Sequence, residues 1–280
     1  MHSLNPLIKQ ITAINTSGRI ALCGYFLTGY TSPKKFYSLI KSLDAIDIFE
    51  FGIPTDDPFL DGPDISRAHD HVTENIGLNA ETALPLLGGL QDIPQPRFVM
   101  TYAKEGRELD GFLRLCLLNG IQGVLAPDVP VDEAKNVALI ASSMNIAYIG
   151  FIHDGMGAEE TAKIATLCDI IYLKVSCGKT GQKGELSAET IKRLQDRITE
   201  LRTINNQLLI GAGIGIQTPE QIQTLAALDI NMVVVGTSLM NTITAGVASL
   251  QEYTRSLYDA TVRPRRFSES PVRQSLLVTI

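Results

Sequence analysis

Short runs of β-branched and aromatic residues alternate along the chain with longer amphipathic segments. Strands that are buried on both faces read as short apolar runs, whereas helices that cover a sheet repeat apolar residues every three or four positions. The alternation therefore predicts parallel strands that are joined by crossover helices. Eight runs fit the strand pattern: Arg19–Leu27, Ile46–Phe51, Arg97–Tyr102, Gly123–Ala126, Ile146–Ile152, Ile170–Val175, Leu208–Ile214 and Met232–Val235.

The segments between these runs predict the crossover helices, and several open with a capping residue or a proline. They are Pro33–Leu43, Asn79–Leu90, Leu109–Leu118, Val131–Ser143, Ala158–Leu167, Ser187–Thr203, Pro219–Leu228 and a closing helix over Leu239–Tyr258. The stretch through Ile14 predicts an extra helix that covers the barrel floor. Eight strand-helix units predict an α/β fold, a (βα)₈ TIM barrel that fills one domain over residues 1–260.

The composition changes after Ala260. Segment 261–280 mixes prolines, serines and clustered arginines without periodicity, so we expect a flexible C-terminal tail. A doubly wound open sheet would show the same alternation of strands and helices. Its G-x-G-x-x-G fingerprint is expected after the first strand, where this chain has GYTS (29–32), so the barrel is favoured.

Composition and charge exclude several classes of partner. A net charge of -6, with no cluster of lysines and arginines before the tail, disfavours binding to nucleic acid. No segment reaches the roughly 18 to 20 apolar residues of a membrane span. The four cysteines, Cys23, Cys116, Cys168 and Cys177, lack C-x-x-C spacing and fit a reducing compartment. We therefore expect a cytoplasmic protein.

The most informative polar residue is Glu50, which stands inside the second apolar run. In DIFEFG (47–52), strand alternation puts Ile48 and Glu50 on one face and two phenylalanines on the other. Burial at a barrel mouth would raise the pKa of this carboxyl toward neutrality, which suits a group that gives and takes a proton. A structural salt bridge is the alternative. The next loop, GIPTDDPFLDGP (52–63), offers Asp61 as a second carboxylate with a different role.

Two glycine-rich loops predict a phosphate site, because barrels often bind phosphate after strands seven and eight. The loops read GAGIGIQTP (211–219) and VGTS (235–238), and their small residues let backbone N–H groups approach an anion. Glycines that only form turns are the alternative for either loop alone. The segment CGKTGQKG (177–184) is predicted to be a mobile lid that excludes water.

Nucleotide hydrolysis and metal binding receive no support. The P-loop pattern is not met, because no glycine stands five residues before Gly178. His69 and His71 are two apart in an expected helix and so point to different faces, while His153 stands alone. We expect these histidines to be surface or hydrogen-bonding groups, and we expect no metal site.

Taken together, the motifs resemble those of the tryptophan synthase alpha chain family. The family carries E-L-G-I-P-x-S-D-P-x-A-D-G-P where this chain has EFGIPTDDPFLDGP (50–63). The resemblance continues at LAPDVP (125–130), at GKTG (178–181) for G-V-T-G, at GIGI (213–216) for G-F-G-I and at GT (236–237) for G-S. It covers Arg19 to Leu257.

The resemblance implies a carbon-carbon lyase of tryptophan biosynthesis, which splits indole-3-glycerol phosphate into indole and glyceraldehyde 3-phosphate by a retro-aldol step. It assigns both proton transfers chiefly to Glu50 and gives Asp61 a hydrogen bond from the indole N–H. It implies that Tyr102 and Tyr172 border the indole pocket and that Thr180 anchors the lid. It implies further that the phosphate is held by backbone groups of Gly181, Gly213, Ile214, Gly236 and Thr237.

The resemblance also implies that the chain needs no metal or organic cofactor. Its expected partner is a pyridoxal-phosphate tryptophan synthase beta chain, with which it would form a heterotetramer and to which it would deliver indole.

Some positions depart from the family pattern and leave alternatives open. The loop AKEG (103–106) is shorter than the one that normally helps to meet the beta partner, Ser176 and Cys177 replace the usual approach to the lid, and Lys174 is unexpected in the sixth run. One alternative is a stand-alone indole-producing or related aldol-type lyase of specialised metabolism. Another is a non-catalytic barrel that binds the phosphate ligand and activates the beta partner allosterically.

Overall fold

Eight parallel strands lie at the centre of the computed structural model, which describes residues 4–103, 109–174, 186–213 and 215–264. The strands are β1 (Ala21–Leu27), β2 (Ile48–Gly52), β3 (Arg97–Met100), β4 (Gly123–Leu125), β5 (Ala147–His153), β6 (Ile170–Lys174), β7 (Leu209–Gly213) and β8 (Met232–Val235). They pair in sequence order, and β8 pairs with β1, so the barrel is closed. Each strand overlaps one of the predicted runs, and the TIM-barrel prediction is confirmed.

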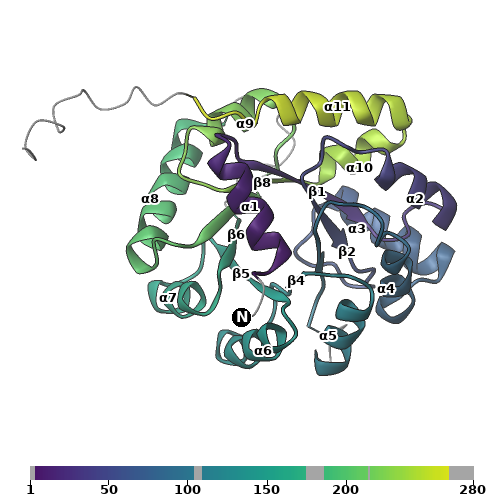
Figure 1. Ribbon diagram of the computed structural model, residues 1–280, viewed down its shortest axis with the longest axis horizontal. Coiled ribbons are helices and arrows are strands. Elements are labelled where there is room, and N and C mark those ends of the chain that lie inside the picture. Colours follow the sequence, from purple (N-terminus) through teal and green to yellow (C-terminus); the bar gives the residue numbers. More distant parts are fainter. Residues whose placement is uncertain (1–3, 104–108, 175–185, 214, 265–280) are drawn as a thin grey trace, which may run out of the picture.

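A ring of helices surrounds the barrel (Figure 1). The helical segments are α1 (Pro6–Thr16), α2 (Pro33–Lys41), α3 (Pro63–Asp70), the π-helical turn η1 (His71–Ile76), α4 (Ala80–Gly88), α5 (Leu109–Leu118), α6 (Val131–Ser143), α7 (Ala158–Leu167), α8 (Ala188–Ile204), α9 (Pro219–Ala226), α10 (Thr237–Ile243) and α11 (Val247–Asp259). Local signals explain several starts. At α9, Thr218 and Gln221 form a capping box and Pro219 occupies the first turn.

The prediction of one closing helix over Leu239–Tyr258 is wrong. Two helices, α10 and α11, occupy this region, and the chain breaks between them at Gly246. Gly246 has φ = 100°, a left-handed value that favours glycine and that cannot continue a right-handed helix. The apolar periodicity of the segment continues on both sides of the break, and it therefore concealed the break.

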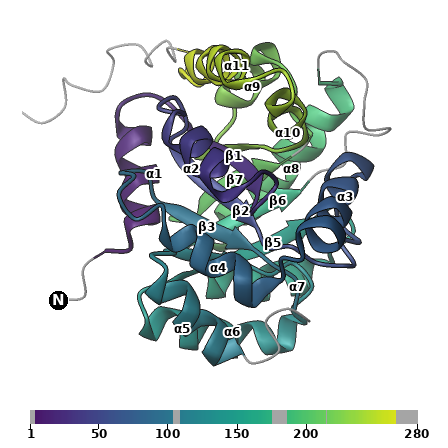
Figure 2. The ribbon, with the colours of Figure 1, turned by 90° about the vertical axis from the view of Figure 1, so that its right-hand side faces the viewer.

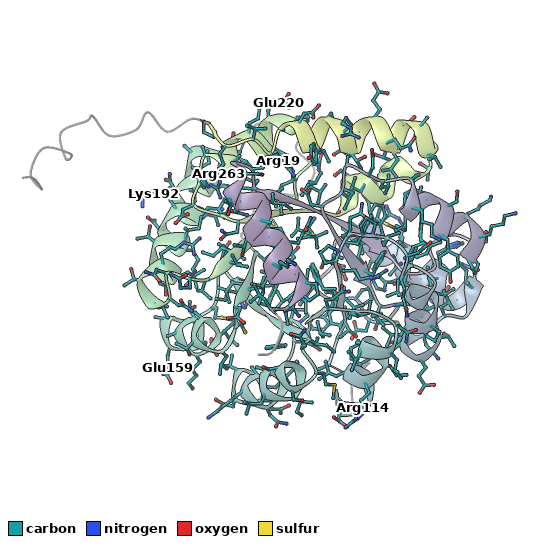
Figure 3. The ribbon with its side chains drawn as sticks, viewed as in Figure 1. Arg19, Arg114, Glu159, Lys192, Glu220 and Arg263 are labelled. Atoms are coloured by element: carbon teal, nitrogen blue, oxygen red, sulfur yellow. The ribbon has the colours of Figure 1, made fainter. Side chains whose placement is uncertain are left out.

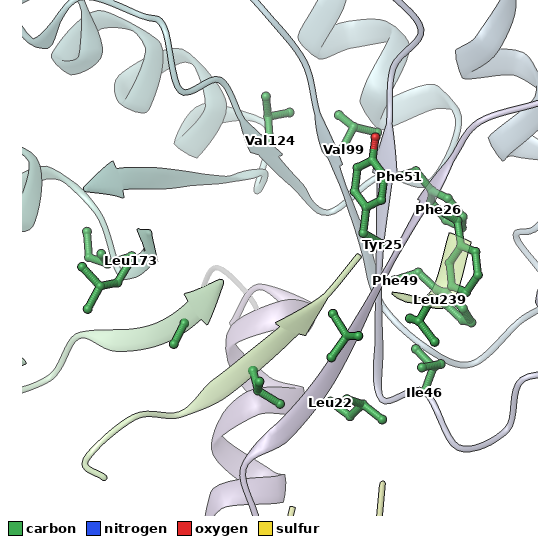
Figure 4. Close-up of a cluster of buried hydrophobic side chains, with 14 of the residues drawn as sticks. Leu22, Tyr25, Phe26, Ile46, Phe49, Phe51, Val99, Val124, Leu173 and Leu239 are labelled. Atoms are coloured by element: carbon green, nitrogen blue, oxygen red, sulfur yellow. The ribbon is translucent and has the colours of Figure 1, made fainter. Parts of the chain in front are cut away.

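Two layers of apolar side chains hold the barrel together. Phe49 and Phe51 point outward from β2 and stack with ring centroids 5.7 Å apart, between the sheet and the helices (Figure 4). Ile48 points inward, into a second cluster that fills the barrel. The strand alternation predicted for this run is therefore confirmed, and it places Glu50 on the inner face with Ile48.

Helix α1 closes the barrel floor, as the sequence predicted, and crosses the barrel opening in Figure 1. Leu7, Ile11 and Ile14 are buried against the inner cluster. Asn5 caps the helix and also donates hydrogen bonds to the carbonyls of Gln122 and Asn145, at 2.9 and 2.7 Å. The turned view of Figure 2 shows α1 to one side of the strands, so the mouth lies at the other end of the barrel.

Charged side chains cover the outside of the ring of helices. Glu159, Lys192 and Glu220 point away from the barrel in Figure 3, whereas Arg19 and Arg263 lie beside α1. Residues 261–263 bond back to the barrel floor, because the Ile20 N–H donates to the Thr261 carbonyl at 3.0 Å. The division into a domain over 1–260 and a flexible tail remains a prediction, since residues 265–280 lie outside the described part. Within the described part, no helix combines the length and apolarity that crossing a bilayer requires.

Candidate active site

A cavity of about 380 Å³ opens at the C-terminal ends of the strands. Strand ends from several sides of the barrel contribute to it, as barrel enzymes require. Six of the residues predicted to form the site line this cavity: Glu50, Asp61, Tyr172, Gly213, Gly236 and Thr237. Thr180, Gly181 and Ile214 lie outside the described residues, as does the whole of the predicted lid (177–184).

Glu50 lies on the inner face of β2 and is only 3% exposed. No described residue makes a hydrogen bond to its Oε2 atom. Burial, and secondly the nearby charge of Asp61, raise the pKa of Glu50 to about 8. A salt bridge to a buried cation, the alternative considered from sequence, is not found among the described residues. Glu50 therefore holds a proton at neutral pH and has an oxygen available for a ligand.

The raised pKa of Glu50 predicts that Glu50→Gln stabilises the protein at neutral and alkaline pH. Between about pH 4.5 and 8, the folded state binds a proton at Glu50 that the unfolded state has released, so stability falls as the pH rises through this window. The neutral amide avoids this loss. We expect the variant to be more stable by roughly a few kcal/mol at pH 8 to 9 and little different from wild type below pH 4. Urea unfolding at several pH values measures the difference, and a gap that is constant with pH would contradict the assignment.

Asp61 lies in the loop that leaves β2, and its side chain is largely buried, at 12% exposure. The Tyr102 hydroxyl donates a 2.8 Å hydrogen bond to its Oδ2 atom, and the backbone N–H of Asp61 donates to the Pro58 carbonyl at 2.9 Å. Burial raises the pKa of Asp61, while the bond from Tyr102 and the charge of Lys174 oppose that rise. Asp56 and Asp57, the other acids of this loop, are exposed. Asp61 is thus the carboxylate that the loop presents to the cavity.

The structure places Tyr102 behind Asp61, with Phe59 packed against its ring at a centroid distance of 5.0 Å. Tyr102 is 1% exposed and is not among the residues that line the cavity. Burial and the neighbouring Asp61 raise the pKa of Tyr102, so the phenol keeps its proton and remains a donor. Tyr172 does border the cavity, as expected.

A buried group behind the carboxylates was not identified from sequence. His69, on α3, is fully buried, and its Nδ1 accepts a hydrogen bond from the Thr55 N–H at 3.1 Å. Burial lowers the pKa of His69 to about 4, so the ring is neutral and carries its proton on Nε2. That nitrogen lies 3.4 Å from the Tyr25 hydroxyl oxygen and 3.9 Å from Asp61 Oδ2. His69 is therefore a hydrogen-bonding histidine, as expected, but one that faces the site.

The predicted phosphate-binding residues lie on another side of the cavity. Gly213 is the last residue of β7, Gly236 directly follows β8, and Thr237 begins α10. A Cβ atom at position 213 would overlap the hydroxyl of Tyr172, whereas one at position 236 would meet nothing closer than 3.5 Å. Gly213 is therefore needed for the packing of Tyr172, a reason that the glycine pattern did not reveal. Gly215, with φ = 74°, also lines the cavity and takes the left-handed conformation of a tight turn.

Gly213→Ala is expected to displace Tyr172 and to destabilise the fold by about 1–3 kcal/mol, as overpacking of a close contact does. The melting temperature in thermal unfolding measures the loss of stability. The binding of inorganic phosphate is measured on the same variants. Gly236→Ala is the matched control, because its methyl group has room and should leave the melting temperature nearly unchanged. Equal destabilisation by both substitutions would show that the contact with Tyr172 is not the cause.

No group of three His, Cys, Asp or Glu side chains within the described ranges is arranged to hold a metal ion. His71 is exposed and His153 accepts a hydrogen bond from the Gly155 N–H at 3.0 Å, so both fit the roles expected from sequence. Cys23, Cys116 and Cys168 are buried as free thiols.

Comparison with known proteins places this site in a family. The family model described as tryptophan synthase alpha chain matches residues 11–267. The tryptophan synthase alpha chain of Carboxydothermus hydrogenoformans is 31% identical over 224 residues, which cover 77% of this chain and 81% of that protein. That of Pyropia yezoensis is 28% identical over 260 residues, covering 89% and 96% of the two chains.

Solved structures share the fold. A chain of Mycobacterium tuberculosis tryptophan synthase superposes with a TM-score of 0.80 at 24% identity, covering 94% of this chain and all of that one. The alpha subunit of tryptophan synthase from Legionella pneumophila superposes with a TM-score of 0.79 at 21% identity, covering 92% and 99% of the two chains. The match of the family model over nearly the whole chain and the 31% identical relative lead to one conclusion: this protein belongs to the tryptophan synthase alpha chain family.

Proposed function

We propose that this chain cleaves indole-3-glycerol phosphate to indole and glyceraldehyde 3-phosphate, as a lyase of tryptophan biosynthesis, and that Glu50 and Asp61 carry the reaction. The observation that supports this most directly is a protonated, buried Glu50 that lines one cavity with Asp61. Two acids in different environments can divide the roles of proton donor and charge stabiliser.

In this proposal Glu50 begins as the acid and Asp61 as the carboxylate, and the protons balance over one turnover. Glu50, in its acid form, gives its proton to the indole ring carbon that bears the side chain. Positive charge then builds on the ring, and Asp61 stabilises it by accepting a hydrogen bond from the indole N–H. The Glu50 carboxylate next takes the proton of the glycerol hydroxyl as the carbon-carbon bond breaks. Indole and the aldehyde leave, and Glu50 is again in its acid form.

The remaining lining residues suit the two ends of this substrate. Tyr172 and Tyr25 offer aromatic and hydroxyl surface near the carboxylates, where the indole would lie. Gly213, Gly236 and Thr237 lie where backbone N–H groups can approach a phosphate, and Ile214, Thr180 and Gly181 would complete that site. Tyr102 acts in this proposal through Asp61, to which it donates its hydrogen bond.

We propose further that the enzyme is cytoplasmic and delivers indole to a pyridoxal-phosphate beta chain within a heterotetramer. The similar structure from Mycobacterium tuberculosis is a tryptophan synthase, the enzyme whose alpha chain this family forms.

A product assay tests the proposal. The purified chain is incubated with indole-3-glycerol phosphate, alone and with a tryptophan synthase beta chain, and the products are identified by mass spectrometry. We expect indole and glyceraldehyde 3-phosphate in equal amounts, formed faster with the partner. A folded chain that releases neither product in either condition would refute the assignment. If the isolated chain formed no product in a single-turnover experiment but accelerated the reaction of the beta chain, the non-catalytic allosteric barrel would be indicated instead.

A further inference from the structure

Lys174 ends β6 and is half-buried among the residues that line the cavity. Its Nζ donates a 2.8 Å hydrogen bond to the backbone carbonyl of Leu60, in the loop that follows β2. Strands β2 and β6 do not pair with each other in the barrel. The lysine side chain therefore connects two separate parts of the mouth, across the space that the substrate would occupy.

Both backbone polar groups of Leu60, which belong to the two peptide units on either side of its Cα atom, are hydrogen-bonded. Its N–H donates to the Tyr102 hydroxyl oxygen at 3.3 Å, and its carbonyl accepts the bond from Lys174. The next residue is Asp61, whose carboxylate accepts a bond from the same Tyr102 hydroxyl. The two side chains thus fix the backbone on which the position of the Asp61 carboxylate depends. Misplacement of a reacting or binding group by about 1 Å can lower a rate about 10²-fold.

Lys174 also contributes a positive charge near Asp61. The titratable groups that act on Asp61 or contact it come from several elements: Tyr25 on β1, Glu50 on β2, Tyr102 after β3, Tyr172 and Lys174 on β6, and His69 on α3. Burial keeps the three phenols and His69 neutral, and Glu50 holds its proton. Among these described groups, Lys174 is the one that carries a positive charge.

We propose that Lys174 is a positioning residue of the lyase, which fixes the Leu60–Asp61 peptide from the opposite wall of the cavity and places a positive charge beside the Asp61 carboxylate. The inference rests on the proposed function for its catalytic meaning, and on the contacts of Lys174 for its geometry. It gives a role to a residue that the family resemblance left unexplained.

Three substitutions separate the two parts of this role. Lys174→Met removes the charge and the hydrogen bond, Lys174→Gln keeps a donor without the charge, and Lys174→Arg keeps both. For cleavage of indole-3-glycerol phosphate we expect kcat/KM to fall about 10- to 100-fold in the methionine variant, less in the glutamine variant and least in the arginine variant. Lys192→Met is the matched control, because Lys192 is exposed on α8 and pairs with Asp196.

The decisive readout is the titration of Asp61 in the ligand-free protein, followed by NMR of carboxyl carbons. Because the charge of Lys174 lowers the pKa of Asp61, the titration midpoint should move to higher pH in the methionine and glutamine variants and stay in place in the arginine variant. The acid limb of kcat/KM should move in the same direction. A midpoint that does not move in the methionine variant would overturn the proposal, whether or not the wild-type chain releases indole.

Measurements of ligand binding distinguish a lysine that acts on Asp61 from one that binds the phosphate group. We expect Lys174→Met to weaken the binding of indole and to leave the binding of glycerol 3-phosphate nearly unchanged, because the lysine acts on Asp61. Loss of glycerol 3-phosphate binding with retained indole binding would overturn the proposal and would make Lys174 a phosphate ligand. Failure of the wild-type chain to release indole would count against the proposed function alone.

Discussion

Glu50→Gln is expected to lower kcat for indole release about 10²- to 10⁴-fold, the range that a general acid-base group contributes. The amide has the same shape but can neither give the proton to the ring carbon nor accept the hydroxyl proton. Steady-state assays at saturating substrate, with quantification of indole by mass spectrometry, measure the loss. Since no described residue donates a hydrogen bond to Glu50 Oε2 and glutamine keeps the shape of the side chain, the fold should persist.

The control for this variant is Glu252→Gln, which removes an exposed carboxyl on α11. It should keep wild-type kcat. If Glu50→Gln kept kcat within a factor of about three, Glu50 could not be the group that transfers the protons, and another acid of the cavity would have to replace it in the mechanism.

Asp61→Asn should lower kcat/KM about 10²- to 10³-fold, the effect of removing one group that stabilises charge in a transition state. The asparagine carbonyl can still accept the bond from Tyr102, so the loop should keep its position. The pH profile provides a second readout. Because the charge of Asp61 contributes to the raised pKa of Glu50, the neutral amide should lower that pKa. Activity requires protonated Glu50, so the alkaline limb should move to lower pH.

Asp57→Asn is the matched control, because Asp57 lies in the same loop and is exposed. It should leave both the rate and the pH profile unchanged. An alkaline limb that keeps its position in Asp61→Asn would contradict the electrostatic coupling between the two carboxyls, even if the rate fell.

The strands and the two carboxylates could be predicted because they depend on local patterns. A period of two placed Glu50 beside Ile48 on the inner face, and a loop with a long family match located Asp61. The buried polar side chains that lie next to the two carboxylates could not be predicted in this way. Tyr25 stands in an apolar run and His69 in a helix, and only the folded barrel brings their polar atoms within 3.4 Å of each other.

Lys174 was also a residue whose role the sequence could not predict. Its presence at the end of the sixth run was noticed, but its partner lies 114 positions away in the sequence. The glycines also had reasons that composition does not reveal, since Gly213 makes room for Tyr172 and Gly246 interrupts a periodic helix. Tertiary contacts of this kind determine the roles of single residues, whereas sequence periodicity determines where the helices and strands form.

Closure of the barrel depends on the pairing of Ala21–Gly24 with Met232–Val235, the two ends of the strand order. A chain that emerges from the ribosome cannot form this pairing until the segment through Val235 has been made. Until then, β1 and the most recently formed strand each present an unpaired edge, and such edges invite association with other chains. Slower synthesis at low temperature, or a chaperone that shields β1, should therefore raise the yield of native protein.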